Sequence, residues 1–347
     1  MRIPMRSIKK HLLLLFLGTA IFLSAFNLSA QGSDPSPEKG PHSSPFACTS
    51  FAVYSEETLY GMNFDYPEVE IRFTISSSGN LQVFQMEFMQ EGSFVPTVGM
   101  NSAGLFSSCQ MLYPEVNGGG QASSNEVYTW QVYRESLANF RVVEEVAEFI
   151  SDKRVVHWSL TLHDLIADKY GDAMVVEAGA EANVITRIEG DFIVMTNFPN
   201  GEFVGKSYQD VEGAGAKRYK AAYEHILDTK AAFDVDLALE ALEKAISTGE
   251  WGTLCSMVFD PEKGEVFIAL KRDFDQIWRV SLEDRTIEGY RGVRKGANMA
   301  LDTLGVKGSE LEELAAFSMI RWEYIVGCVA LLAAVVVAFA LRNRQRA

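Results

Sequence analysis

The sequence has little positive charge, few cysteines and few histidines. Its 347 residues include 31 Lys and Arg against 46 Asp and Glu, a formal net charge of −15. An acidic surface argues against nucleic acid as a partner. The five histidines form no Cys–His pattern, and His157 and His163 match no metal-ligand spacing. We therefore expect no metal and no cofactor.

The four cysteines are Cys48, Cys109, Cys255 and Cys328. Cys328 lies in a long apolar run and is read as a small apolar residue there. Cys109 and Cys255 leave two alternatives open, a disulfide in an oxidising compartment or two separately buried thiols. In either case Cys48 has no partner, which makes it a candidate reactive thiol.

Both ends of the chain predict membrane targeting. Residues 1–30 combine a basic start, an apolar run and a small-residue end, the pattern of a cleaved signal peptide or an uncleaved signal anchor. Residues 324–341 carry no charge and precede the basic tail 342–347, so they predict a transmembrane helix with a cytoplasmic C-terminus. A buried core helix is the alternative. The expected location is the cell membrane, single-pass, with the body extracytoplasmic.

Between these ends the composition predicts one domain. Residues 31–47 are rich in Pro, Gly and Ser and are expected to be a disordered propeptide or linker. Residues 48–306 have the length of one large domain, and 307–323 are expected to be a helical stalk. Strand patterns at both ends of the domain flank helical periodicity, as at 128–150. This order predicts an α+β fold of stacked sheets covered by helices. Homo-oligomerisation is left open.

The first two predicted strands bring a thiol and a carboxylate together. Residues 49–54 and 59–66 have strand character and are joined by the polar residues 55–58. If the turn is centred between Glu56 and Glu57, Cys48 lies directly opposite Asp65. Their side chains would then share one face of the sheet, about 5 Å apart.

Six motifs follow one another in the order of a known family: CTS at 48–50, GMNFD at 61–65, GMNSAGL at 99–105, ADKYGDAMVVE at 167–177, MTNFP at 195–199 and AKRYK at 216–220. Over about 48–270 the chain resembles the linear amide C–N hydrolases of the N-terminal-nucleophile superfamily. That group is typified by choloylglycine (bile-salt) hydrolase and penicillin V acylase, with acid ceramidase and autoproteolytic acyltransferase relatives. The resemblance implies a four-layer αββα sandwich and removal of everything before Cys48.

The resemblance also implies a set of catalytic residues. Cys48 would be the nucleophile, Asp65 would orient its α-amine, Asn197 would help form the oxyanion hole, and Arg218 would support the site. An α-amine with a pKa near 7.7–8.0 can accept the thiol proton, whereas the amide of an uncut chain cannot. Cleavage between Ala47 and Cys48 would therefore switch the site on.

Each of these residues also has a structural alternative. Asp65 would cap a turn, Asn197 would be a turn residue before Phe-Pro, and Arg218 would be a solvated helix charge. Asp168, in a hairpin turn, is expected to be structural.

The chain departs from the family pattern at two places. Met62 stands where arginine is usual, so a cation that would stabilise the thiolate is missing. Arg72, on the next strand, is a candidate to replace it. The second oxyanion or substrate-pocket position, usually Asn or Tyr, falls near Gln110 or Met111. We expect the pocket itself to be built by the loops 67–72, 113–124 and 201–213.

The leading hypothesis is an exported, membrane-anchored hydrolase of linear amide (N-acyl) bonds that processes itself and works through a thioester. An N-acyltransferase or a dipeptidase with the same nucleophile is the nearest alternative. A non-catalytic binding module is another, which Met62 favours. Conjugated bile salts, penicillin V, N-acyl amino acids and lipid amides all remain open as small-molecule substrates.

Overall fold

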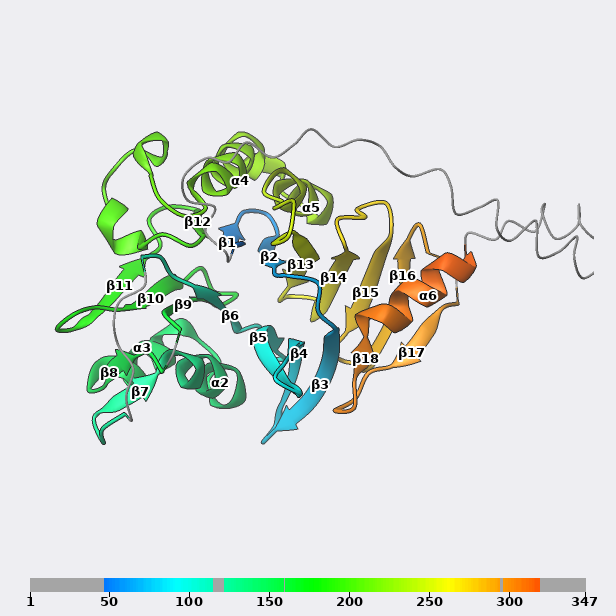
Figure 1. Ribbon diagram of the computed structural model, residues 1–347, viewed down its shortest axis with the longest axis horizontal. Helices are drawn as coiled ribbons and strands as arrows, with labels where there is room; N and C mark the ends of the chain where they lie inside the picture. The colour runs from blue at the N-terminus through cyan, green and yellow to red at the C-terminus, as the bar shows by residue number, and fades with distance from the viewer. Residues whose placement is uncertain (1–46, 115–121, 159, 294–295, 319–347) are drawn as a thin grey trace, which may run out of the picture. The chain divides into compact units, whose positions relative to one another are not determined.

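The computed structural model describes residues 47–114, 122–158, 160–293 and 296–318. These residues form two eight-stranded sheets (Figure 1). The first sheet has the order β12 (Phe192–Met195), β1 (Ala47–Tyr54), β2 (Thr58–Asp65), β13 (Thr253–Asp260), β14 (Glu265–Leu270), β15 (Ile277–Ser281), β16 (Thr286–Arg291) and β17 (Asn298–Ala300). The second has the order β11 (Asn183–Arg187), β10 (Ala173–Ala178), β9 (Leu162–Ala167), β6 (Phe106–Met111), β5 (Ser93–Asn101), β4 (Leu81–Gln90), β3 (Ile71–Ser78) and β18 (Val306–Lys307).

Helices cover the outer face of each sheet, so the predicted α+β fold is confirmed. The helices are α2 (Thr129–Asn139), α3 (Val143–Ser151), α4 (Ala216–Thr229), α5 (Val235–Lys244) and α6 (Gly308–Ser318), with the short 3₁₀ turns η2 (Asn200–Phe203), η3 (Tyr208–Asp210) and η4 (Lys230–Ala232). In Figure 1, α4 and α5 lie over the first sheet, while α2 and α3 lie against the second, beside the parallel pair β7 (Glu126–Tyr128) and β8 (Arg154–Val156).

Four apolar clusters account for this layering, and the smallest joins the second sheet to α2. The largest contains inward-facing side chains of both sheets, and we call it the central layer. A second cluster joins Phe51 and Val53 of β1 to Ala222 and Ile226 of α4. A third joins the second sheet to α3. Because strand side chains alternate between faces, one strand can contribute to both layers: β1 places Ala52 in the central layer and Phe51 and Val53 in an outer cluster.

The opening hairpin has a register one residue away from the expected one. Tyr54 pairs with Thr58, and the loop therefore has three residues, with the Ser55 N–H and hydroxyl both donating to the Glu57 carbonyl. Cys48 consequently lies opposite Phe64, while Asp65 lies opposite Ala47. The expectation that Cys48 faces Asp65 was wrong, because a one-residue shift moves a side chain to the other face of the sheet.

The helical segment expected at 128–150 is two helices. The side-chain amide of Asn101 donates to the carbonyls of Leu137 and Phe140, which end α2. Its oxygen accepts from the Ala103 and Leu105 N–H groups and so closes the turn after β5. This asparagine of the GMNSAGL motif thus has a structural task. The strands β5, β11 and β15 to β17 were not anticipated from the sequence.

Cys109 and Cys255 are separately buried free thiols, one in each sheet. Of the two alternatives left open by the sequence, the structure has the one without a disulfide.

The C-terminal part of the described chain packs on the domain. The expected stalk overlaps α6, whose Leu311 and Ala315 are buried in the central layer. No helix of the described ranges is long and apolar enough to cross a membrane. The predicted export signal, most of the predicted linker, the predicted transmembrane helix and the basic tail lie outside the described residues.

Candidate active site

Cys48 is the second residue of β1 and is 6% exposed, with its side chain in the central layer. Ala47 precedes it in the same strand, so the Cys48 nitrogen is a peptide amide here. That N–H donates to the Asn197 side-chain oxygen over 2.9 Å. The nucleophile candidate is therefore held at its backbone before any cleavage.

Asn197 and Arg218 form a hydrogen-bonded frame around this strand end. Arg218 donates from Nη1 to the Cys48 carbonyl (2.5 Å) and from Nη2 to Asn197 Oδ1 (2.7 Å). Its Nη1 also reaches the Thr49 hydroxyl at 2.8 Å. Asn197 Nδ2 donates to the Met111 carbonyl at 2.7 Å. Arg218 is thus a partly buried participant in this frame and not the solvated helix charge of the alternative interpretation.

Asp65 also belongs to this frame, but its side chain lies on the other face of the sheet from the side chain of Cys48. Its Oδ1 accepts a 2.5 Å hydrogen bond from the Thr253 hydroxyl, and its Oδ2 lies 3.5 Å from Arg218 Nη1. Among the described residues no donor makes a hydrogen bond to that Oδ2, although the residue is 1% exposed. The structure thus brings Cys48, Asp65, Asn197 and Arg218 together, despite the register error.

Burial shifts the acid–base behaviour of this group. Burial raises the pKa of Asp65 to about 7, although the charge of Arg218 and the Thr253 hydrogen bond oppose the shift. Burial also raises the pKa of the Cys48 thiol to about 12, and the nearby Asp65 charge adds to it. A backbone hydrogen bond from Asp65 and the Arg218 charge act the other way. In this uncut form the thiol is protonated at neutral pH.

A glycine makes room for Arg218. Gly215 has φ +79° and immediately precedes α4, whose first turn carries Arg218. A Cβ on Gly215 would lie 2.8 Å from both Arg218 Nη2 and Thr196 Oγ1. Any other residue at this position would therefore disturb both the left-handed backbone and the guanidinium.

The remaining predicted site residues lie elsewhere. Met62 is fully buried in the central layer, opposite Ser50 in β1. Arg72 points to the outer face of the second sheet and pairs with Glu87, so it does not replace the missing arginine. The cation beside Cys48 is Arg218. Met111 contributes its carbonyl, as described above.

Gln110 points into the central layer and donates to the Ser50 hydroxyl at 2.5 Å. Ser108 donates to the same hydroxyl at 3.0 Å. Gln110 is therefore tied to the strand of Cys48, two residues along from the thiol. Sequence reasoning missed Thr253, Thr49 and this serine pair, whose contacts with the site join strands far apart in the chain.

Asp168 is structural, as expected. Its carboxylate accepts from the Val143 N–H at the start of α3 and from the Tyr170 and Asp172 N–H groups of its own turn. Within the described ranges no group of three or more His, Cys, Asp or Glu residues could hold a metal ion.

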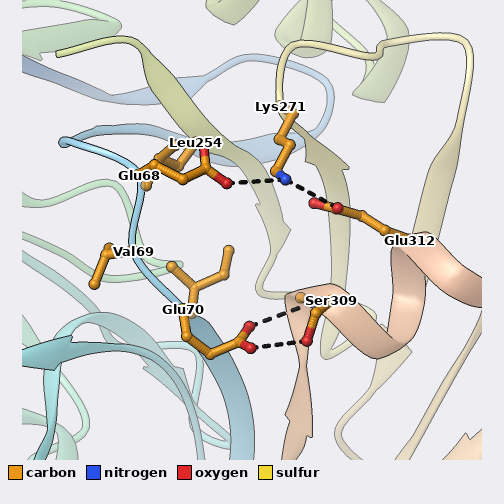
Figure 2. A pocket seen from close by; sticks show the side chains of 9 residues that line it. Glu68, Val69, Glu70, Leu254, Lys271, Ser309 and Glu312 are labelled. Atoms are coloured by element: carbon orange, nitrogen blue, oxygen red, sulfur yellow. Dashed lines mark hydrogen bonds and ion pairs between the residues drawn. The ribbon is translucent and has the colours of Figure 1, made fainter. Parts of the chain in front are cut away.

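One cavity lies beside the loop that follows Asp65. Its volume is about 230 Å³, and Figure 2 shows Lys271 between Glu68 and Glu312, with Glu70 facing Ser309. The Lys271 ammonium is 3.0 Å from each of its two carboxylates. Part of the predicted pocket loop 67–72 therefore does line a cavity. Neither Cys48 nor Asp65, Asn197 or Arg218 lines it.

Known proteins resemble this chain in sequence and in fold. The model of the linear amide C–N hydrolases, choloylglycine hydrolase family, matches residues 48–234, more than half of the chain. A variant of conjugated bile acid hydrolase from Clostridium perfringens is 17% identical, with a TM-score of 0.52 over 70% of this chain and 96% of that one. Penicillin V acylase from Agrobacterium tumefaciens is 16% identical, with a TM-score of 0.53 over 68% and 86%. A search of curated proteins found no match.

Proposed function

Because the chain belongs to the linear amide C–N hydrolases of the choloylglycine hydrolase family, we propose that it hydrolyses an N-acyl amide with Cys48 as its N-terminal nucleophile. The observation that carries this proposal is the frame around Cys48, in which Asn197 holds its nitrogen and Arg218 its carbonyl. The family match also begins at Cys48. The relatives named above act on a conjugated bile acid and on penicillin V, and both compounds are candidates here.

The first step of the proposal is self-cleavage before Cys48. The sulfur attacks the carbonyl carbon of Ala47, the bond from that carbon to the Cys48 nitrogen breaks, and a thioester to sulfur forms while the nitrogen gains a proton. Water then hydrolyses the thioester, which leaves a free thiol and a free amine on Cys48. Asp65 has its pKa raised to about 7, and because its carboxylate lies on the other face of the sheet from the thiol, it would take the thiol proton near neutral pH through a bridging water at the end of the strand.

Cleavage would also give Asp65 its missing partner. Ala47 lies opposite Asp65 in the hairpin, so its removal opens the position beside the carboxylate. The new α-amine is at that end of the strand and carries hydrogens that Asp65 Oδ2 can accept. An amine held there can shuttle the proton from thiol to leaving group in each turnover.

Asn197 is the proposed oxyanion donor in that cycle. Its Nδ2 already donates to the Met111 carbonyl, but a side-chain amide carries two hydrogens, and the second is available to a developing oxyanion. One such donor contributes about 3 kcal/mol to transition-state stabilisation in comparable sites. The acyl group would rest on Cys48 as a thioester until water releases it.

The test combines mass and activity. The intact mass and N-terminal sequence of the purified chain should show a start at Cys48, and Cys48→Ala should remain uncut and inactive. Cys255→Ala removes another buried thiol from the same sheet and should be processed like wild type. Wild type should hydrolyse at least one of a conjugated bile acid, penicillin V, an N-acyl amino acid and a lipid amide. An uncut wild-type chain inactive on all four would refute the proposal.

Met62 supports a second candidate, a binding module that has kept the fold without the reaction. It replaces the family arginine and is packed in the central layer. Such a protein would keep residues before Cys48 and would not react with a thiol-directed probe at Cys48. The same N-terminal sequencing therefore separates the two candidates.

Export and membrane anchoring are further parts of the proposal, supported by the sequence alone. The apolar run at 324–341 with its basic tail would tether the domain outside the cytoplasm. Protease added to intact cells should then degrade the domain. Protection of the domain from that protease would contradict the predicted orientation.

A further inference from the structure

Three polar side chains form a row across the second sheet, inside the central layer. Gln110 of β6 lies directly opposite His163 of β9, and His163 lies directly opposite Glu177 of β10. All three are at most 3% exposed. His163 Nδ1 is 3.3 Å from Glu177 Oε1, and because a carboxylate can only accept, that nitrogen donates. We call these three residues the polar row.

One end of the polar row is fixed to the strand of the nucleophile. Gln110 donates to the hydroxyl of Ser50, which is two residues beyond Cys48 in β1 and shares its face. The hydroxyl of Ser108 adds a second bond to the same atom. The second sheet thereby holds the strand of Cys48 through polar contacts within an otherwise apolar layer.

The other end is fixed to the turn that follows Asn197. Glu177 Oε1 accepts from the Asn200 N–H at 2.8 Å, and Oε2 accepts from the Gly201 N–H at 2.9 Å. These are the first two residues of η2, three and four positions after Asn197. Gly201 is needed for this approach, since a Cβ there would lie 2.4 Å from Val184 and 3.3 Å from the carboxylate.

We propose that Glu177, with His163 behind it, is the positioning residue that sets the turn of Asn197 relative to Cys48. The two ends of the polar row hold the two sides of the site: Gln110 holds the strand of Cys48, and Glu177 holds the turn that follows Asn197. Among the described residues no hydrogen bond links Gln110 to His163, so the proposal rests on the Glu177 end. Asn197 Oδ1 in turn receives the Cys48 N–H, so a displaced turn changes the contact at the nucleophile itself. This inference rests on the proposed function for its catalytic consequence.

The buried polar atoms of the row indicate that packing alone does not explain why these three positions hold polar side chains. His163 Nε2 and Gln110 Oε1 have no hydrogen-bond partner among the described residues. Unpartnered buried atoms reduce stability, so a purely structural row would be better served by apolar side chains. Glu177, in contrast, accepts three hydrogen bonds, two of them from the turn.

The first experiment compares Glu177→Gln with wild type. Glutamine offers one acceptor oxygen in place of two, so one N–H of η2 loses its bond. We expect processing at Ala47–Cys48 and kcat to fall roughly 10–100-fold, with KM within about threefold, because small displacements of a reacting group have effects of this size. An unchanged kcat in correctly folded Glu177→Gln would overturn the proposal.

A matched pair of variants then examines His163. Asparagine places an amide nitrogen near the position of Nδ1, whereas glutamine extends it toward Nε2, so only His163→Asn keeps the donor to Glu177. We expect His163→Asn to retain most of the wild-type kcat and His163→Gln to lose roughly tenfold. Equal losses in both variants would show that His163 does not act through Glu177.

Asp164→Asn is the control, because Asp164 neighbours His163 on β9 but faces away from the central layer. It should leave processing and kcat unchanged, and a loss matching Glu177→Gln would refute a specific role for the row. Hydrogen exchange in an uncleavable Cys48→Ala background tests the coupling without catalysis. Glu177→Gln should speed exchange at Gly201 and at the residue 48 amide. Faster exchange at Gly201 alone would refute this inference but would not affect the proposed function.

Discussion

Two buried aspartates, one in each sheet, differ in what surrounds them. Asp65 ends β2, accepts a hydrogen bond from Thr253, and has Arg218 3.5 Å away. Asp164 lies in β9 opposite Cys109, and apart from a weak contact with the Cys109 thiol neither of its carboxyl oxygens has a hydrogen-bond partner among the described residues. Burial raises the pKa of both carboxyls. The surroundings of Asp65 are built to accept a charge, and those of Asp164 keep it neutral.

The comparison supports the proposal that Asp65 is the aspartate whose charge is used in catalysis. An acid with a pKa near the working pH exchanges protons most effectively, and Asp65 meets that condition. Its position beside the end of β1 adds the geometry, and among the described residues its Oδ2 is paired with Arg218 but accepts no hydrogen bond. Among the described residues Asp164 forms no ion pair, and it faces the layer of α2 on the outer side of the second sheet. The two sites can be separated by substituting each aspartate with the isosteric amide.

Asp65→Asn should have the largest effect on activity. The amide keeps the volume and can still accept from Thr253, but it can neither take a proton nor hold an ammonium group by charge. We expect the rate of processing and kcat to fall by roughly 10²–10⁴-fold, the range for loss of a general base. Mass spectrometry over time measures the rate of processing, and the rate of product release gives kcat. Rates close to wild type would place the proton transfer on another group.

The pH dependence of processing sharpens the same assignment. Asp65 acts as a base only when it is ionised, so the rate should rise with pH and level off above its pKa of about 7. Below that value the rate should fall about tenfold for each pH unit. A rate that keeps rising well above pH 8 would instead point to ionisation of the Cys48 thiol, whose pKa is about 12 in the uncut form.

A pair of glycine variants tests the positioning of Arg218. Gly215→Ala adds a methyl group 2.8 Å from the guanidinium, whereas Gly249 has a similar φ of +87° with nothing within 4 Å of an added Cβ. Both variants should lose about 1–2 kcal/mol of stability because alanine strains a left-handed backbone. Only Gly215→Ala should also slow processing, by roughly tenfold. Equal processing rates in the two variants would mean that Arg218 tolerates displacement.

The sequence predicted which residues meet at the site better than it predicted how they meet. Cys48, Asp65, Asn197 and Arg218 were identified through motifs in family order, and they are in contact. Their geometry depended on a loop of polar residues whose length, three and not four, cannot be read from composition. The one-residue difference in loop length places Asp65 on the face of the first sheet that α4 covers, where it pairs with Arg218. The four predicted residues still meet, because Arg218 reaches the end of β1 from that face and contacts both Asp65 and the Cys48 carbonyl.

Contacts between distant strands were beyond prediction. Thr253 reaches Asp65 across 188 positions, and Gln110 reaches Ser50 across 60. The polar row needed the pairing of β6 with β9, which a pattern of alternating side chains does not specify. Met62 and Arg72 show the same limit. Their strands were recognised, but only the observed packing shows that one is buried between the sheets and the other faces outward.

The smallest expected effect is that of Asp164→Asn, which should change stability and not activity. The pKa of Asp164 is well above its ordinary value because of burial, so the folded chain keeps the proton. Below the unfolded pKa of about 3.9 both states are protonated, and this contribution to stability is fully present. As pH rises, the unfolded chain releases its proton first, so the stability of wild type falls until the folded pKa is passed.

An asparagine at position 164 has no proton to lose, so the variant should lack this part of the pH dependence. At pH 8 we expect Asp164→Asn to be more stable than wild type by about 1–3 kcal/mol, the scale for a buried group without partners. At pH 4 the two should be close. Urea unfolding at both pH values measures the difference. A variant less stable than wild type at pH 8 would mean that the carboxylate has a stabilising partner, and the contrast with Asp65 would fail.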